Sequence, residues 1–345
     1  MALSPQTNAT LEDIAQVLRE ADDVVIAGHV SPDGDCIGSQ LALMHVLRAL
    51  GKTVTCTKAK DDPLDAGICY LPGAAEIVYA GSFRGRVGTF VAVDVPNADR
   101  MMPAQWKLHE KAKVTVTVDH HEVPECVADH NYVDPDSTSA SLLVWKLAGL
   151  LGQQTPEVAQ CAYTGLMTDS GSFHNQNTTV EAFELAAQMV RAGADPSLAA
   201  ISMFQSRSLA SVKLQGLVAD RLTFACDGRF VISWLTQDDF ARLGATKADS
   251  EHMIDLLRSL EGVRVACMLR EQDTGVRGSY RAKDNTDVRT MAMRHHGGGH
   301  RAAAGFSTRK PMDLAVSRII GEWEEFFAAE DAGGEAAGDQ PADRV

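Results

Sequence analysis

Three short apolar runs in the first half of the chain each end in ionisable side chains, and this recurrence restricts the fold more than any other feature. The runs are Val24–Ala27, Phe90–Val93 and Val114–Val118. Apolar, β-branched runs of this length are typical of buried strands. Helical patterns lie between and after them, near residues 38–50, 139–151, 156–167 and 179–192. Strands that alternate with helices predict an α/β domain in which a parallel sheet is covered by helices on both faces.

The ionisable residues that follow the three runs are His29, Asp33 and Asp35, then Asp94, then Asp119, His120 and His121. Sites in parallel sheets form at the carboxyl ends of the strands, so these side chains should converge at one edge. A further carboxylate, Asp169, follows the helical segment 163–167. Taken alone, Asp94 or Asp169 would more often be a cap or turn residue than a ligand. Together, five carboxylates and three imidazoles would repel and lose solvation at a cost of several kcal/mol, which divalent cations would offset.

Two metal ions make chemical sense of this cluster. Ions roughly 3.5–4 Å apart share and activate a water and clamp a phosphoryl oxygen. Asp94 is placed to bridge both ions. Mixed imidazole and carboxylate ligands favour manganese, with iron, cobalt or zinc as alternatives, over a purely oxygen-coordinated magnesium site.

A second, smaller α/β block follows, with strand-like runs at 229–235, 263–269 and 276–280 and helical stretches near 250–260 and 286–294. We predict a catalytic domain over residues 1–195, a linker over 196–221 and a second domain over 222–328. The stretch 329–345 is rich in alanine, glycine and acidic residues, a composition typical of disorder.

Charge and cysteine content narrow the function classes. The chain has a formal net charge of −14. Binding to long nucleic acid requires a broad basic surface, so this charge argues against such a partner and favours small anionic ligands. The seven cysteines form no C-x-x-C pair, so we expect reduced thiols and a cytoplasmic protein. No apolar run reaches the roughly 18 residues that span a bilayer, so no membrane partner is expected. The oligomeric state is left open, a homodimer included.

Five motifs resemble those of the DHH phosphoesterase family, in the same order from about residue 22 to 306. They are Gly28-His29-Val30-Ser31-Pro32-Asp33-Gly34-Asp35, Phe90-Val91-Ala92-Val93-Asp94, Asp119-His120-His121, Gly165-Leu166-Met167-Thr168-Asp169-Ser170-Gly171-Ser172-Phe173, and Gly297-Gly298-Gly299-His300-Arg301-Ala302-Ala303-Ala304-Gly305. The fifth resembles the hallmark of the DHH-associated domain. The resemblance implies an active site in the cleft between the two domains.

The resemblance also implies residue roles. His29, Asp33 and Asp94 would hold one metal ion; Asp35, Asp94, His120 and Asp169 would hold the other. Asp119 would orient an imidazole, and His121 would face the substrate phosphate as a hydrogen-bond donor or as a proton source. In the second block, Ser279 and Arg281 on a Ser-x-Arg strand, together with Gly297, Gly298, Gly299 and His300, would bind substrate, with Arg281 on a substrate phosphate. His174 and His296 replace residues more usual in the family, near the expected substrate contacts.

Within the family, the arrangement most resembles the bifunctional oligoribonucleases and pAp phosphatases. Such an enzyme hydrolyses RNAs of two to five nucleotides, the 3′-phosphate of adenosine 3′,5′-bisphosphate, or both, with a water activated by two metals. A linear or cyclic dinucleotide phosphodiesterase (pApA or cyclic di-AMP), an exopolyphosphatase and an inorganic pyrophosphatase are enzyme alternatives. A non-catalytic nucleotide-binding regulator is the alternative of another class, and it would be marked by loss of a metal ligand; no expected ligand is missing.

Overall fold

The computed structural model describes residues 7–95, 97–121, 128–299 and 301–337. The chain divides into two compact units, Met1–Ser206 and Arg207–Val345, and each is described by itself. The division falls inside the range predicted as a linker. That range is largely helical, since it contains α7 (Pro196–Phe204) and α8 (Leu209–Asp220).

Unit 1 is built on a sheet of six parallel strands in the order β3-β2-β1-β4-β5-β6. The three predicted strands are its centre and are direct neighbours: β1 (Val24–Ala27), β4 (Thr89–Val93) and β5 (Val114–Asp119). The outer strands β2 (Val54–Lys58), β3 (Val78–Tyr79) and β6 (His130–Val133) were not predicted. They are short or rich in threonine and other polar residues, which weakens the apolar signal.

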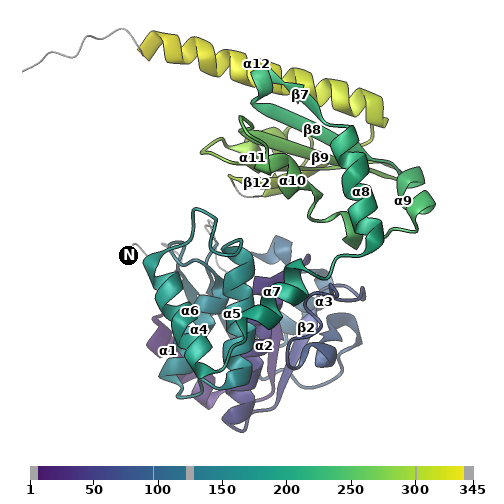
Figure 1. The fold of residues 1–345 in the computed structure, drawn as a ribbon. Helices are drawn as coiled ribbons and strands as arrows, with labels where there is room; N and C mark the ends of the chain where they lie inside the picture. The colour runs from purple at the N-terminus through teal and green to yellow at the C-terminus, as the bar shows by residue number, and fades with distance from the viewer. Residues whose placement is uncertain (1–6, 96, 122–127, 300, 338–345) are drawn as a thin grey trace, which may run out of the picture. The chain divides into compact units, whose positions relative to one another are not determined.

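Helices cover both faces of this sheet, as predicted. Ile26, Val91 and Val118 point to one face and pack against α1 (Leu11–Glu20), α2 (Gly34–Ala49), α4 (Ala140–Leu150), α5 (Pro156–Asp169) and α6 (Val180–Ala192). Val25 and Phe90 point to the other face, where they pack near α3 (Pro103–His109). Figure 1 shows α4, α5 and α6 side by side on the first face. Short 3-10 turns occupy Ala74–Glu76, Ala80–Ser82 and Ala98–Arg100.

Helix α2 begins at Gly34, four residues before the predicted start at 38. Its N-cap is Asp33, whose Oδ1 accepts hydrogen bonds from the backbone N–H of Asp35 (3.1 Å) and Cys36 (3.0 Å). A capping aspartate satisfies amides that the first helical turn leaves without partners. Asp35 therefore lies in the first turn of a buried helix and not in a loop.

Unit 2 contains a mixed sheet in the order β11-β12-β10-β9-β8-β7. Its strands are β7 (Thr223–Ala225), β8 (Phe230–Leu235), β9 (Val265–Gln272), β10 (Gly275–Ala282), β11 (Gly298–Gly299) and β12 (Ala303–Thr308). Only β8 and β9 are parallel; the other pairs are antiparallel. The antiparallel register of β9, β10 and β12 matters below, because it decides which side chains share a face.

Helices also cover this second sheet on both faces. One face packs against α8, α9 (Gln237–Leu243) and α10 (Met253–Ser259), through residues such as Leu214, Ile254 and Ala266. The other packs against α11 (Val288–Met293) and α12 (Met312–Ala337), which Figure 1 labels. On this face Trp323 stacks on Phe230. Short 3-10 turns lie at Cys226–Gly228 and Ala248–Ser250.

Helix α12 also corrects an expectation about the C-terminal stretch. It continues to Ala337, so residues 329–337, predicted as disordered, are helical. Residues 338–345 lie outside the described residues. Among the described helices, none combines the length and apolar character needed to cross a bilayer.

Candidate metal centre

The carboxyl ends of β1, β4 and β5 deliver their ionisable residues to one edge of the sheet in unit 1. The loop after β1 carries His29 and Asp33, and α2 adds Asp35. Asp94 follows β4, and Asp119, at the end of β5, precedes His120 and His121. The C-terminal residue of α5, Asp169, reaches the same cluster, with its Oδ2 3.8 Å from His120 Nε2. All eight residues singled out from the N-terminal sequence therefore gather in one place.

Asp94 is the centre of the cluster. Its side chain is only 2% exposed, and its oxygens lie 3.3 Å from His29 Nε2, 3.5 Å from His120 Nε2 and 3.4 Å from His121 Nδ1. The backbone there has φ = 56°, a left-handed conformation that few residues other than glycine, asparagine and aspartate adopt readily. Burial acts to raise the pKa of Asp94, but His120 and His29 outweigh it and hold that pKa below its usual range. Asp94 is thus a buried anion surrounded by imidazoles.

Asp35 is anchored by the N-terminus of α4. Its Oδ2 accepts a hydrogen bond from Ala140 N (2.8 Å) and its Oδ1 one from Ser141 N (2.9 Å). Helix N-termini present such amides and favour negative charge. Burial, with repulsion from Asp94 and Asp169, still raises the pKa of Asp35 well above its usual value.

Asp119 is fully buried and holds the imidazole of His121. The His121 Nδ1–H donates to Asp119 Oδ1 at 2.8 Å, and the backbone N–H of His120 donates to the same oxygen at 2.8 Å. A carboxylate in this position fixes the tautomer and orientation of an imidazole. The sequence-based role for Asp119, orienting an imidazole, corresponds to this contact.

Asp169 completes the cluster from the far end of α5. Asn177 Nδ2 donates to its Oδ2 at 3.2 Å. Burial raises the pKa of Asp169 to about 6; the charge of His120 opposes the shift, and the carboxylates of Asp33 and Asp94 add to it. Without cations, part of this cluster therefore retains protons near neutral pH.

The donors present fit divalent cations. Three groups have ligand atoms within 4.8 Å of one another: Asp35, His120 and Asp169; Asp94, His120 and His121; and His29, Cys36 and Asp94. Asp94 belongs to two groups, as a bridging ligand would. Its Oδ1 is buried and accepts no hydrogen bond within the described part of the chain, which leaves that oxygen available to a cation.

Sequence reasoning missed four contributors to this site: Cys36, Asn177 and the amides of Ala140 and Ser141. Cys36 is buried beside His29, and burial raises the pKa of its thiol. The two amides lie 105 and 106 residues from Asp35, whereas Asn177 lies eight residues after Asp169, in the loop that follows α5. The N-cap Ser139 before an apolar helical pattern was the one available signal for the α4 N-terminus.

The substrate-binding candidates other than His174 lie in unit 2. Ser279 and Arg281 are on β10, Gly298 and Gly299 form β11, and Gly297 directly precedes them. His300 lies outside the described residues. His174, in unit 1, follows α5 in an exposed turn, and its Nδ1–H donates to Gly171 O at 3.0 Å.

Two of the three glycines have a structural reason to be glycine. A Cβ at Gly297 would lie 2.2 Å from Gly305 O. Gly299 has φ = 143°, and a Cβ there would lie 2.5 Å from Ala303 O. A Cβ at Gly298 would meet no atom within 4 Å. Steric contacts within the fold therefore account for glycine at 297 and 299, whereas no described atom near Gly298 requires glycine there.

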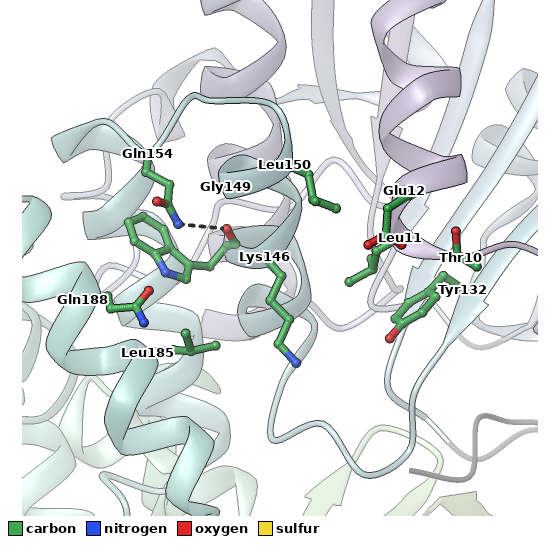
Figure 2. Close-up of a pocket in the computed structure, with 11 residues that line it drawn as sticks. Thr10, Leu11, Glu12, Tyr132, Lys146, Gly149, Leu150, Gln154, Leu185 and Gln188 are labelled. Carbon is green, nitrogen blue, oxygen red and sulfur yellow. Dashed lines mark hydrogen bonds between the residues drawn. The ribbon is translucent and has the colours of Figure 1, made fainter.

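A groove of about 500 Å³ lies elsewhere on unit 1 (Figure 2). It is lined mainly by apolar atoms of α1, α4 and α6 and by Tyr132 on β6. Figure 2 shows the Lys146 side chain extending into it and Gln154 bonded to the carbonyl of Trp145 (3.4 Å). Among the described residues that line it, Glu12 is the one carboxylate and none is a histidine or cysteine.

Both units of the chain match known protein families. Residues 23–166 match the N-terminal domain of the DHH family, and residues 227–329 match the DHHA1 domain. The chain is 31% identical over 312 residues to the bifunctional oligoribonuclease and PAP phosphatase NrnA of Thermus thermophilus, covering 89% of this chain and 91% of that protein.

Solved structures share the fold. An exopolyphosphatase-related protein from Bacteroides fragilis superposes with a TM-score of 0.84 at 24% identity, covering 92% of this chain and 96% of that one. RecJ from Thermus thermophilus in complex with Mn²⁺ gives a TM-score of 0.53 at 17% identity, covering 93% of this chain and 55% of that one.

Proposed function

This chain belongs to the DHH family, and on that premise we propose that it hydrolyses RNAs of two to five nucleotides, the 3′-phosphate of adenosine 3′,5′-bisphosphate, or both. The observation that carries the proposal is the cluster around Asp94, in which carboxylates, imidazoles and the Cys36 thiol form three overlapping groups with ligand atoms within 4.8 Å of one another. The relationship to the Thermus thermophilus NrnA protein, named for these two activities, supports the choice of substrates.

We assign His29, Asp33 and Asp94 to one cation, and Asp35, Asp94, His120 and Asp169 to the other. When bound, two such ions supply Lewis-acid activation of a water and neutralisation of charge on the phosphoryl group. Manganese suits the mixed donor set, and RecJ, which shares the fold, has been seen with this ion.

The protein's own residues hold this arrangement. Capping of α2 fixes Asp33, and the N-terminus of α4 fixes both oxygens of Asp35. Asp119 holds His121 through Nδ1, so a protonated His121 carries its second proton on Nε2. We assign that Nε2 proton to the oxygen that leaves the phosphate, as general acid catalysis requires.

Turnover should fall steeply with RNA length. Each phosphate beyond a small binding site meets a chain with a net charge of −14 and gains no counterion release. We expect efficient cleavage from the dinucleotide to about the pentanucleotide and declining specificity constants up to a 24-mer, measured at fixed salt and manganese. Equal specificity constants along the series would contradict the proposal.

The same assay discriminates the alternatives. A panel of adenosine 3′,5′-bisphosphate, pApA, cyclic di-AMP, pyrophosphate and polyphosphate, each with manganese, ranks the possible substrates. Preference for cyclic di-AMP or polyphosphate would replace the proposed substrate class. Nucleotide binding without hydrolysis of any compound would indicate the non-catalytic regulator.

Manganese binding should release more protons at acidic pH. Asp169, with a pKa of about 6 in the cation-free protein, is largely protonated at about pH 5.5 and ionised at about pH 7.5. A cation must displace that proton, so the affinity should weaken as the pH falls through 6, by at most about tenfold per pH unit for one proton. Calorimetry in buffers of different ionisation enthalpy counts the protons released. Asp169→Asn should reduce the difference between the two pH values, with the remainder left to Asp35, whose pKa is also raised. A proton count independent of pH in the unmodified chain would exclude Asp169 as a ligand.

Gly298→Ala should weaken substrate binding without weakening the fold. The added methyl meets no atom of the protein, so the free energy of unfolding should change by less than about 1 kcal/mol. If a ligand approaches the backbone here, KM for adenosine 3′,5′-bisphosphate should rise about tenfold, as expected for one lost hydrogen bond. Gly321→Ala, in open space on α12, is the matched control. An unchanged KM would indicate that no ligand approaches the backbone at Gly298 and that residues 297–299 have a structural role alone.

A further inference from the structure

Three arginines on neighbouring strands of unit 2 make no ion pair among the described residues: Arg270 on β9, and Arg277 and Arg281 on β10. Eight other arginines do pair with carboxylates, namely Arg48, Arg221, Arg229, Arg242, Arg258, Arg264, Arg289 and Arg318. Further described arginines without an ion pair lie outside the strands of this sheet, so the three are set apart by their shared place on β9 and β10. Arg270 and Arg277 are directly opposite each other in the antiparallel register. Like charges in that position destabilise a sheet, so the presence of this arginine pair needs an explanation.

The strand register places the arginines around a floor of small residues. Ser279 is opposite Gly305 on β12, and Gly305 is opposite Gly298 on β11. Because side chains alternate between faces with a period of two, Arg277 and Arg281 share the face of Ser279 and lie on either side of it. Ser279, Gly305 and Gly298 therefore form a row of small residues on the face that carries Arg277 and Arg281.

Arg277 leans across this floor towards β12. Its Nη1–H donates to Ser307 Oγ at 3.2 Å, and its Nη2 lies 3.0 Å from where a Cβ of Gly305 would be. A side chain at Gly305 would therefore displace the guanidinium.

Arg270 is held by Ser250, in the 3-10 turn Ala248–Ser250. Its Nε–H donates to Ser250 Oγ at 2.7 Å, and its Nη2 donates to Ser250 O. Burial lowers the pKa of Arg270; Glu251 opposes the shift, and the charges of Arg281 and Arg277 add to it. An anion bound beside Arg270 and Arg277 would relieve this repulsion.

We propose that Arg277, supported by Arg270, forms a second phosphate subsite beside the one assigned to Arg281. Positions 277 and 281 are about 13 Å apart along the strand, and the long side chains can converge on two phosphates of one nucleotide from the two sides of the floor. A guanidinium fork matches phosphate oxygens geometrically. The ligand class is a nucleotide with two separate phosphate groups or linkages. The inference rests on the proposed function for the role of Arg281, and it deepens that function by explaining preference for bisphosphates and dinucleotides over monophosphates.

Binding to the full chain, treated with a chelator so that nothing is hydrolysed, tests the subsite. The ligands are adenosine 3′,5′-bisphosphate, 3′-AMP and 5′-AMP. Arg277→Gln should raise Kd for the bisphosphate about 10-fold to 100-fold, to a value near that of the tighter monophosphate, because one charge-assisted contact is lost. That monophosphate should bind the variant and the unmodified chain equally.

Arg289→Gln is the matched control, since Arg289 is exposed and lies on α11 against the opposite face of the sheet. Unchanged bisphosphate affinity in Arg277→Gln, or equal weakening of all three ligands, would overturn the subsite. Failure of the unmodified chain to hydrolyse any phosphate ester would overturn the proposed function, while the binding comparison would still decide the role of Arg277.

Discussion

Replacing Asp94 by asparagine is expected to reduce manganese-dependent turnover at least about a thousandfold while the chain remains folded. Asp94 faces His29, His120 and His121 within 3.5 Å, and it belongs to both cation groups that we assign. Loss of its charge therefore disturbs both ions. Asparagine preserves the shape of the side chain and tolerates the left-handed backbone conformation. Alanine adopts that conformation less readily, so Asp94→Ala would add backbone strain.

The measurements are kcat with a short RNA, manganese stoichiometry and thermal unfolding of the cation-free protein. Asp23→Asn is the matched control, because Asp23 also has a positive φ (43°) in unit 1 but precedes β1, at the opposite end of that strand from the cluster. Asp23→Asn should keep full activity. Near-normal turnover of Asp94→Asn would refute the bridging assignment.

Gly165→Ala is expected to disable the site from a residue that contacts neither metal nor substrate in our assignment. Gly165 lies within α5, and a Cβ there would be 1.9 Å from Ser141 Oγ and 2.8 Å from Asp35 Oδ1. Overpacking of this kind costs about 1–3 kcal/mol, against which the better helix propensity of alanine returns about 1 kcal/mol. The unfolding free energy should therefore fall by about 0–2 kcal/mol, whereas the displaced Asp35 should cost about 100-fold in turnover.

Gly216→Ala on α8 is the control for helix propensity. Its Cβ meets no atom within 4 Å, so the variant should be slightly more stable and fully active. If Gly165→Ala retains turnover and manganese affinity, close contact between α5 and the carboxylate of Asp35 is not required for the site.

The sequence by itself determined which ionisable residues gather at the edge of the first sheet, the residues that we assign to the cations. His29, Asp33, Asp94, His120 and their neighbours each lie within a few residues of the end of an apolar run. In a parallel sheet the carboxyl ends of adjacent strands meet, so local pattern alone implies their convergence. The same logic predicted three adjacent central strands and helices on both faces, which the structure confirms.

Only the tertiary structure decided the features that depend on register and packing between distant segments. The anchoring of Asp35 by α4 joins residues more than 100 positions apart. The contacts that a Cβ atom would make also depend on packing: a Cβ at Gly297 or Gly299 would meet backbone atoms, whereas one at Gly298 would meet none within 4 Å. Arg270 and Arg277 lie opposite each other because β9 and β10 pair in one particular antiparallel register. A shift of one residue would turn every side chain to the other face, and no local pattern in either strand specifies that register.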